Sequence, residues 1–526
     1  MNDAKLLDAL RAIVGEDAVR TDDWALALAA SDLHVCGARP LAMIRPQDAA
    51  GVAAVAALAI AHDYAVLPRG GGLSYTGGYA PPHAKSISID LGGLDRIVNI
   101  SAEDMVITVE AGVTWKQIAA ALKPLGLRLP FIGTFSGAGA TIGGGLSHGA
   151  LFFGSARYGS AAEIVLGLEV ALADGTLLRT GQGAVAASDK PFLRTFGPDL
   201  TGLFTHDGGM LGIKTEASFR LIRTPPELGY ASFAFARFDS AIAALSRIAR
   251  ADLAEEVYIL DPSSAKSADT DMGTMLQTAR SVARDAAGPR QAFKALAALV
   301  RAGTKFIPPD HFSLHLTAAG RSQAAVEADL TAARMIATGC AGTPVAATIP
   351  RVARANLFQD LDAVLGADGG RWAALNAKVA HSDAHRLVTA FDALIAPHAT
   401  EMARHGVTCT RLASALANHC FSFEPVFHWR DTWQPLHRAA LSPAALKERV
   451  EPAANPDARA LVDRLRMETV ELFRSLGAAS NQIGRTYPFR SALSAAPEAL
   501  LAELKALLDP KGLMNPGVLG FGLRQS

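Results

Sequence analysis

The chain has 526 residues, half of them apolar, and its 50 basic residues balance its 50 acidic ones. This balance provides no basic surface to recruit nucleic acid, and the length predicts about two to four domains. The four cysteines, Cys36, Cys340, Cys409 and Cys420, form no CxxC pair. Their scatter argues against a disulfide framework and against a structural zinc site.

The first twenty residues form an amphipathic pattern with acids throughout, unlike the basic start and apolar stretch of a secretory signal. The most apolar segment, residues 49–61, is shorter than the roughly 20 residues that span a bilayer. We therefore expect a soluble cytoplasmic protein without a transmembrane segment.

The first third of the chain predicts alternating helices and strands. The pattern indicates a helix at residues 49–62, a short strand at 65–67, and strands beginning at Ser86 and Met105. A glycine-rich loop, Gly70 to Gly78, follows the short strand and leads through two prolines into the next strand. A Rossmann fold would instead show GxGxxG at a strand-to-helix turn, and no GK[ST] of a P-loop is present.

The next segment begins with a predicted helix, residues 114–125, followed by a second glycine-rich loop, Gly133 to Gly149. A hairpin with Asp174-Gly175 at its turn and then a short helix and a strand are predicted up to residue 221. We place a domain boundary at Pro225-Pro226.

Beyond this boundary the pattern predicts an α+β domain. Expected elements are a strand at 231–235, a helix at 240–251, a strand at 256–260, a strand and helix from His311, a helix at 384–405, two strands over 407–429 and a helix at 456–476.

The two glycine clusters predict a phosphorylated cofactor. Glycine lacks a Cβ, so its backbone N–H groups approach an anion closely and its φ can be positive. A glycine-rich connection without a ligand would predict isolated turns, not two clusters.

These loops, the hairpin with its Ala-Asp-Gly turn, the GPDLTGLFTHDGGMLGIKT segment and the terminal DPKGLMNPG occur in one order. Together they resemble the vanillyl-alcohol oxidase / p-cresol methylhydroxylase flavoprotein superfamily. The resemblance implies a bipartite α/β FAD-binding domain of the p-cresol methylhydroxylase type and an α+β cap domain with an antiparallel sheet. The domains expected are residues 1–35 (an N-terminal helical segment), 36–225 (FAD binding), 226–470 (the cap) and 471–526 (a segment returning to the FAD domain).

The same resemblance implies FAD as the cofactor, with the first loop at its pyrophosphate, the second loop along the rest of the dinucleotide, and residues 515–517 returning toward the flavin. The cofactor-binding residues that it implies are Pro68, Arg69, Gly70, Gly71, Gly72, Leu73, Ser74, Gly77, Gly78, Thr134, Gly137, Thr141, Gly144, Ser147, Gly149, Ala150, Ile213 and Asn515.

Two branches of the superfamily remain open. The terminal segments look closest to the glycolate and D-2-hydroxy acid dehydrogenases, but Asn481 and Gln482 stand where that branch has a Glu-His pair. Neutral amides are poor ligands of a divalent cation, so no metal is expected. In the phenolic oxidases, FAD is in several members bonded to a cap histidine. His419 is the candidate here for such a link, beside the alternative of noncovalent FAD.

Oxidation of an alcohol by a flavin needs a base for the hydroxyl proton and a group that orients the substrate. The candidates are His419, Glu424, His428, Arg485 and Tyr487, and each also has a structural interpretation. Arg485, for example, could hold a carboxylate or form a salt bridge to the FAD domain.

The expected function is FAD-dependent oxidation of a CH–OH group, foremost in a D-2-hydroxy acid of the lactate or glycolate type. The alternatives are a 4-hydroxybenzylic alcohol oxidase and a flavin-bound protein without net redox turnover. The expected partners are a small-molecule substrate, an electron acceptor (oxygen, a quinone or a cytochrome) and a second copy of the chain.

Overall fold

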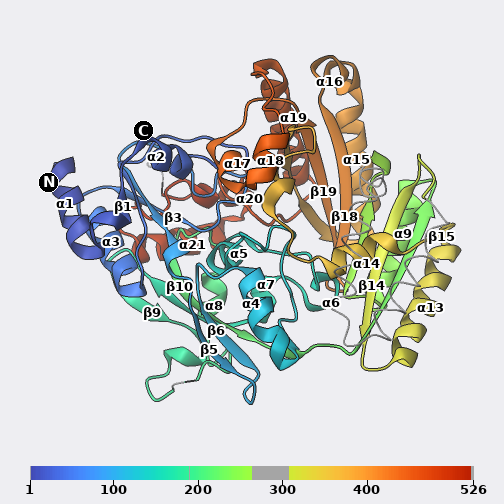
Figure 1. Cartoon of the computed structure of the whole chain (residues 1–526), viewed down its shortest axis with the longest axis horizontal. Helices are drawn as coiled ribbons and strands as arrows, with labels where there is room; N and C mark the ends of the chain where they lie inside the picture. Colours follow the sequence, from blue (N-terminus) through green and yellow to red (C-terminus); the bar gives the residue numbers. More distant parts are fainter. Residues whose placement is uncertain (1, 189, 264–306, 523–526) are drawn as a thin grey trace.

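A computed structural model of the chain describes residues 2–188, 190–263 and 307–522. Part of the expected cap domain, residues 264–306, lies outside the described residues. Figure 1 shows two lobes, one built from the N-terminal half together with the C-terminal end, and one built from the rest.

The first sheet has four strands in the order β1-β2-β4-β3, with β2 and β3 parallel to β4. Its strands are β1 (Val19–Arg20), β2 (Ala42–Ile44), β3 (Ala65–Arg69) and β4 (Ser86–Asp90). Helices α1 (Asp3–Val14) and α3 (Ala49–Ala61) share one apolar cluster with it. The Asp48 carboxylate starts α3 by accepting the Gly51 N–H at 2.7 Å. The helix predicted at residues 49–62 and the strands predicted at 65–67 and from Ser86 are confirmed. The first glycine loop therefore connects two strands of one sheet.

The second sheet is antiparallel, with the order β5-β6-β10-β8-β9. Its strands are β5 (Ile97–Ser101), β6 (Val106–Glu110), β8 (Val165–Ala171), β9 (Leu177–Arg179) and β10 (Ile213–Arg220). The predicted hairpin is β8-β9, where Gly175 adopts φ +89°. Helices α4 (Trp115–Leu122) and α8 (Leu200–Leu203) and the pair β7 (Leu127–Arg128) and β11 (Ile222–Arg223) complete this lobe.

The second glycine stretch differs from the prediction, because residues 142–148 form helix α5 (Ile142–His148). Glycines disfavour a helix, but Ile142 and Leu146 are fully buried against Trp115 and Phe219, and this packing outweighs propensity. The Thr141 hydroxyl accepts the Gly144 N–H at the start of the helix, at 3.4 Å.

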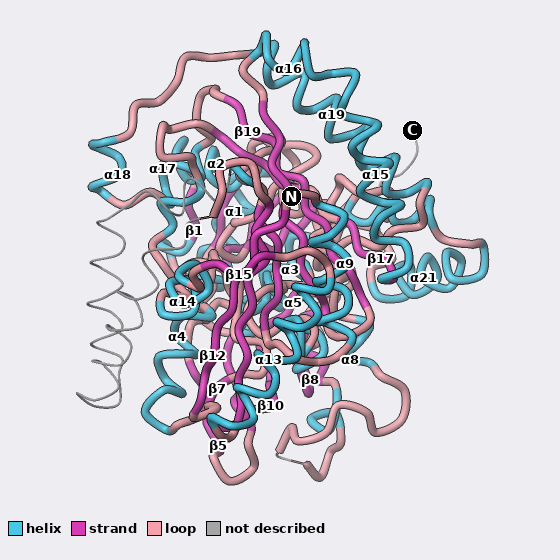
Figure 2. The backbone as a smooth tube through the Cα atoms, turned by 90° about the vertical axis from the view of Figure 1, so that its right-hand side faces the viewer, coloured by secondary structure: helices cyan, strands magenta, loops and turns pink. Residues whose placement is uncertain are grey.

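The cap contains an eight-stranded antiparallel sheet in the order β15-β12-β14-β13-β18-β19-β16, with β17 also paired to β19. Figure 2 looks toward its β15 end. Its strands are β12 (Glu227–Phe235), β13 (Glu256–Leu260), β14 (Phe312–Gly320), β15 (Thr343–Val345), β16 (Arg371–Ala374), β17 (Ala377–Ala380), β18 (Thr408–Leu416) and β19 (Cys420–Trp429). This confirms the expected antiparallel cap sheet.

Helices cover one face of the cap sheet. They are α9 (Phe238–Arg250), α13 (Gln323–Gly339), α15 (Ala384–Ile395) and α19 (Pro456–Ser475). The helix predicted at 384–405 is interrupted near Pro397, and a separate helix α16 (Ala399–His405) follows. Proline has no N–H and clashes with the preceding turn, which explains the break.

The other face of the cap sheet is directed at the first lobe. Along β19, Phe421, Phe423 and Phe427 belong to the apolar cluster, while Ser422 and Glu424 alternate with them. Glu424 shares its face with Trp372, because Trp372 lies opposite His428 in the ladder. The Trp372 ring contacts the Tyr75 ring of the first loop, with centroids 5.3 Å apart.

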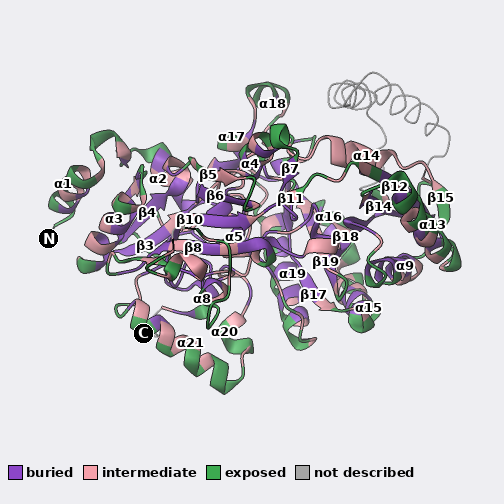
Figure 3. Cartoon of the chain, turned by 90° about the horizontal axis from the view of Figure 1, so that it is seen from below, coloured by how far each residue is buried: buried purple, intermediate pink, exposed green. Residues whose placement is uncertain are grey.

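The C-terminal segment returns to the first lobe. Helix α21 (Ala495–Leu508) lies on its surface, and Met514 then forms a parallel bridge with Val66. Figure 3 shows exposed residues on α1 and α21 at the edge and buried strands between them. Among the helices of the described residues, none combines the length and apolar character that a bilayer crossing needs.

Candidate cofactor and active site

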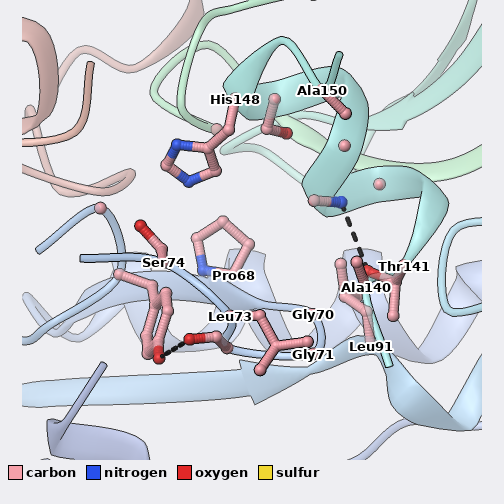
Figure 4. Close-up of a pocket in the computed structure, with 18 of the residues that line it drawn as sticks. Pro68, Gly70, Gly71, Leu73, Ser74, Leu91, Ala140, Thr141, His148 and Ala150 are labelled. Atoms are coloured by element: carbon pink, nitrogen blue, oxygen red, sulfur yellow. Dashed lines mark hydrogen bonds between the residues drawn. The ribbon is translucent and has the colours of Figure 1, made fainter. Parts of the chain in front are cut away.

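A cavity of about 880 Å³, its solvent-open mouth included, lies between the two glycine loops. In Figure 4, Pro68 to Ser74 approach it from one side, and Thr141, His148 and Ala150 from the other. The lining residues are Pro68, Gly70, Gly71, Gly72, Leu73, Ser74, Gly78, Tyr79, Leu91, Trp115, Thr134, Ser136, Ala140, Thr141, Gly143, Gly144, Gly145, Ser147, His148, Ala150, Gly208, Gly209, Gly212, Ile213, Lys214 and Gln482.

The two loops contact each other so closely that glycine is required. A Cβ on Gly71 would lie 2.0 Å from the Gly139 carbonyl oxygen, and one on Gly70 would lie 2.2 Å from Thr141 Oγ1. A Cβ on Gly78 would lie 2.4 Å from the ring of His148. The glycines therefore hold the two cavity walls together.

The first loop also offers hydrogen-bond donors. Within the described part of the chain, the N–H groups of Gly71, Gly72 and Leu73 donate to no protein acceptor, and neither does the buried Nε of Arg69. Backbone amides without protein acceptors are suited to an anion such as a pyrophosphate.

The wall opposite the first loop is formed by a turn that the sequence analysis did not assign. The Asp207 carboxylate accepts from Lys214 Nζ at 2.6 Å, and both side chains are buried. Gly208, Gly209 and Lys214 line the cavity. The HDGG motif was the available signal for this wall.

Asn515 joins three segments around the cavity. Its side-chain amide donates to the carbonyls of Gly78, at 2.8 Å, and Gly208, at 2.6 Å, and its N–H donates to the Val66 carbonyl at 2.8 Å. The C-terminal segment thus fastens the first loop to the opposite wall.

Arg485 has a structural role in the same region. Its guanidinium donates to the Gly77 carbonyl, to Asn515 Oδ1 at 2.9 Å and to the Pro516 carbonyl at 2.7 Å. Burial lowers its pKa to about 10. The two terminal nitrogens are thus used within the protein, while Nε has no protein acceptor among the described residues, so the structural alternative for Arg485 is supported and its contact with a substrate stays a prediction.

Most of the predicted cofactor-binding residues line the cavity. The five that do not are Arg69, Gly77, Gly137, Gly149 and Asn515. Arg69 lies behind the first loop with its guanidinium over the Tyr79 ring, and Gly137 contacts the Phe358 ring. Gly149 ends helix α5 with φ +67°.

A buried polar cluster adjoins the cavity on the side of the cap. Lys378 Nζ donates to Asn376 Oδ1 at 2.8 Å and to Asn481 Oδ1, and Asn481 Nδ2 donates to the Gly149 carbonyl at 3.1 Å. Gln482, next to Asn481, lines the cavity. Lys378 was not predicted: its short strand carries no motif, and its partner Asn481 lies 103 residues away.

Two of the predicted catalytic residues lie in this cluster. Glu424 faces Lys378 on the cap sheet, and burial raises the pKa of its carboxyl. The Tyr487 hydroxyl accepts the Asn376 N–H at 2.7 Å, and burial raises its pKa. Arg466, also buried, donates to the carbonyls of Ala374 and Tyr75, each at 2.9 Å.

The two predicted histidines lie elsewhere. His419 is exposed in the turn that joins β18 to β19, so the expectation that it lies in a strand facing the cofactor is wrong. The hairpin turns at residues 417–419, where Ala417 has φ +48°. His428 Nε2 is hydrogen-bonded to Thr410 Oγ1 at 2.9 Å. His428 lies four residues from Glu424 along β19, which is about 13 Å in an extended strand.

Comparison with known families identifies the cavity. Residues 40–181 match the family described as "FAD binding domain", and residues 491–519 match "FAD linked oxidases, C-terminal domain". The chain contains an FAD-binding domain. The first match includes both glycine loops and the second includes Asn515, whereas the cavity residues from Gly208 to Lys214 and Gln482 lie outside both matches. The open amides of the first loop fit the FAD pyrophosphate.

Curated relatives share this part of the sequence. A probable mitochondrial D-lactate dehydrogenase of Danio rerio is 30% identical over 249 residues, which are 47% of this chain and 48% of that protein. The glycolate oxidase subunit GlcD of Bacillus subtilis is 31% identical over 35% of this chain and 38% of its own length. Each alignment thus spans less than half of the relative.

Solved structures share the whole fold. p-Cresol methylhydroxylase with substrate bound has a TM-score of 0.72 at 19% identity, covering 98% of this chain and 96% of its own. An alkyldihydroxyacetonephosphate synthase has a TM-score of 0.67 at 15% identity, and the match covers 97% of this chain and 85% of the synthase chain. The fold is therefore the two-domain FAD-binding fold of the p-cresol methylhydroxylase type.

Proposed function

We propose that this protein is an FAD-dependent oxidoreductase that oxidises the CH–OH group of a D-2-hydroxy acid of the lactate or glycolate type. The observation that carries the proposal is the cavity between the two glycine loops, which coincides with an FAD-binding domain. The relatives named D-lactate dehydrogenase, glycolate oxidase and D-2-hydroxyglutarate dehydrogenase support the substrate class.

The chemistry divides between the two lobes. FAD, when bound, supplies the acceptor for the hydride that leaves the substrate carbon. The cap supplies Glu424, a carboxylate that can accept the hydroxyl proton. Partly buried Tyr75 of the first loop and buried Tyr487 of the C-terminal segment can donate hydrogen bonds to substrate oxygens.

The substrate class is tested by turnover with an artificial electron acceptor. D-lactate, L-lactate, glycolate, D-2-hydroxyglutarate and vanillyl alcohol are compared at equal concentration with the FAD-loaded protein. We expect turnover of at least one D-2-hydroxy acid and none of L-lactate. Turnover of vanillyl alcohol alone would reject the proposal.

A 4-hydroxybenzylic alcohol oxidase is the second candidate. Its support is the fold of p-cresol methylhydroxylase, which is matched along nearly the whole chain, together with buried Tyr487 and partly buried Tyr75. Among the described residues that line the cavity there is no histidine of the cap, and His419 is exposed in a turn, so we propose noncovalent FAD. Acid precipitation should leave the yellow colour in the supernatant, whereas a yellow pellet would contradict this.

The electron acceptor, a second copy of the chain and the location in the cytoplasm stay predictions. Several relatives are mitochondrial enzymes.

A further inference from the structure

The described cations around the cavity differ in what remains of their hydrogen-bonding capacity. Lys214 is paired with Asp207, and Arg485 and Arg466 donate to protein carbonyls. Lys378 is the buried lysine of this group that is paired with no carboxylate among the described residues: it donates to the neutral side-chain oxygens of Asn376 and Asn481. An ammonium has three N–H donors, so one donor of Lys378 is left over.

The position of Lys378 is rigid. Its side chain is 8% exposed, and β17 pairs with β19 so that Lys378 lies opposite Ser422. Asn376 and Asn481 are themselves bonded to each other, with the Asn481 N–H donating to Asn376 Oδ1 at 2.9 Å. These two amides therefore fix the ammonium, and Asn481 is followed in the chain by Gln482, which lines the cavity.

Glu424 lies diagonally across from Lys378 on the same sheet face, two residues beyond Ser422. Diagonal neighbours of this kind lie about 7–8 Å apart at Cα, within reach of long side chains. Yet among the described residues no hydrogen bond or ion pair joins the two, and Glu424 is only half-buried. The ammonium and the carboxylate are thus neighbours on one sheet face that do not pair with each other.

We infer that Lys378 is the anion-binding residue of the active site and binds the carboxylate of the substrate, held in place by Asn376 and Asn481. This inference rests on the proposed function and names the group that selects an acid over a neutral alcohol. Glu424, the diagonal neighbour of Lys378 on the same sheet face, limits the affinity for anions and is the group available to the hydroxyl end of the substrate.

The test measures binding of oxalate, a carboxylate without an oxidisable C–H bond, to the FAD-loaded protein. Calorimetry and the change of the flavin absorption spectrum both report binding without turnover. We expect Lys378→Met to weaken oxalate binding by about 10- to 100-fold and Lys378→Arg to retain part of it. Glu424→Gln should tighten binding, because a repulsive charge is removed.

The control is Lys447→Met, an exposed lysine of helix α18 (Pro443–Glu448), which should bind oxalate like the unaltered protein. Equal oxalate affinity in Lys378→Met, or no oxalate binding by the unaltered protein, would overturn the inference. If Lys378→Met does not retain FAD, tighter binding in Glu424→Gln supports the inference, and unchanged or weaker binding there overturns it.

The outcomes separate this inference from the proposed function. If oxalate binding depends on Lys378 but no hydroxy acid is turned over, the inference about the anion site stands and the proposed oxidation is rejected. Turnover of D-lactate with the same KM in Lys378→Met would retain the oxidation and reject the site.

Discussion

Single glycines determine whether the cavity can form. In Gly71→Ala the new methyl group would meet the backbone carbonyl of Gly139 at 2.0 Å, and a backbone atom cannot rotate away as a side chain does. We expect a loss of about 1–3 kcal/mol in unfolding free energy and a protein isolated with little FAD. Denaturant unfolding and the ratio of flavin to protein absorbance measure both effects.

Gly183→Ala is the matched control, because a Cβ there meets nothing within 4 Å. It should retain full FAD content. A Gly71→Ala variant with normal FAD content would show that the loops can separate without loss of the cofactor.

The charge of Lys378 predicts a pH dependence. Burial lowers its pKa to about 8, so the ammonium is present below that pH and is lost above it. The groups that act on it are Glu424, Cys420 and His206. Burial raises the pKa of the Cys420 thiol and lowers that of His206, so both are neutral near pH 8.

We therefore expect KM for the hydroxy acid to be constant up to about pH 8 and to rise by up to about tenfold per pH unit above it. Steady-state kinetics from about pH 6 to about pH 10 measure the profile. In Lys378→Arg the rise should vanish, since a guanidinium keeps its charge. A KM that stays flat for the unaltered protein would contradict a charged Lys378 at the substrate.

At the scale of elements, the C-terminal segment holds the first loop against the opposite wall. Asn515 has φ +42°, which Asn and Asp tolerate, so Asn515→Asp removes the two donated hydrogen bonds with little backbone strain. The Gly78 and Gly208 carbonyls would lose a buried donor, and we expect a loss of about 2–3 kcal/mol in unfolding free energy together with weaker FAD binding.

Asn99→Asp, on the exposed strand β5, makes the same chemical change away from the cavity and should alter the unfolding free energy by less than about 0.5 kcal/mol. Thermal unfolding with and without added FAD compares the two variants. Equal stability of both would mean that the segment does not fasten the loop.

The elements near the cavity were largely predictable because their signals are local. The loop between β3 and β4 follows from glycines between two apolar runs, and the β8-β9 hairpin follows from Asp174-Gly175. Helix α5 was not predictable, since the packing that forms it involves Trp115 and Phe219, far away in the sequence.

The candidate site was only partly predictable for the same reason. Glu424 and Tyr487 were found as polar residues in the right segments, but nothing local distinguished them from His419, which the hairpin turns outward. Lys378 depends on the pairing of β17 with β19 and on Asn481, so it required the tertiary structure.

At the scale of the whole molecule, buried charges link the two lobes. Arg128 of the FAD lobe is bonded to Glu255 of the cap, whose other oxygen accepts from Arg354 at 2.9 Å. Glu256 accepts from the Gly154 N–H at 3.0 Å. Removing one partner of such a group leaves an uncompensated buried charge, so these contacts fix the cap sheet above the cavity.

In this arrangement a polar face of the cap sheet lies over the proposed FAD cavity. We propose that the cap residues and the bound FAD act together on a hydroxy acid. The most direct measurement is anaerobic mixing of the FAD-loaded protein with D-lactate, glycolate or D-2-hydroxyglutarate while the flavin absorption is recorded. Our account predicts that at least one of them bleaches the flavin band in a single turnover. A band that none of them bleaches, although dithionite does, would contradict it.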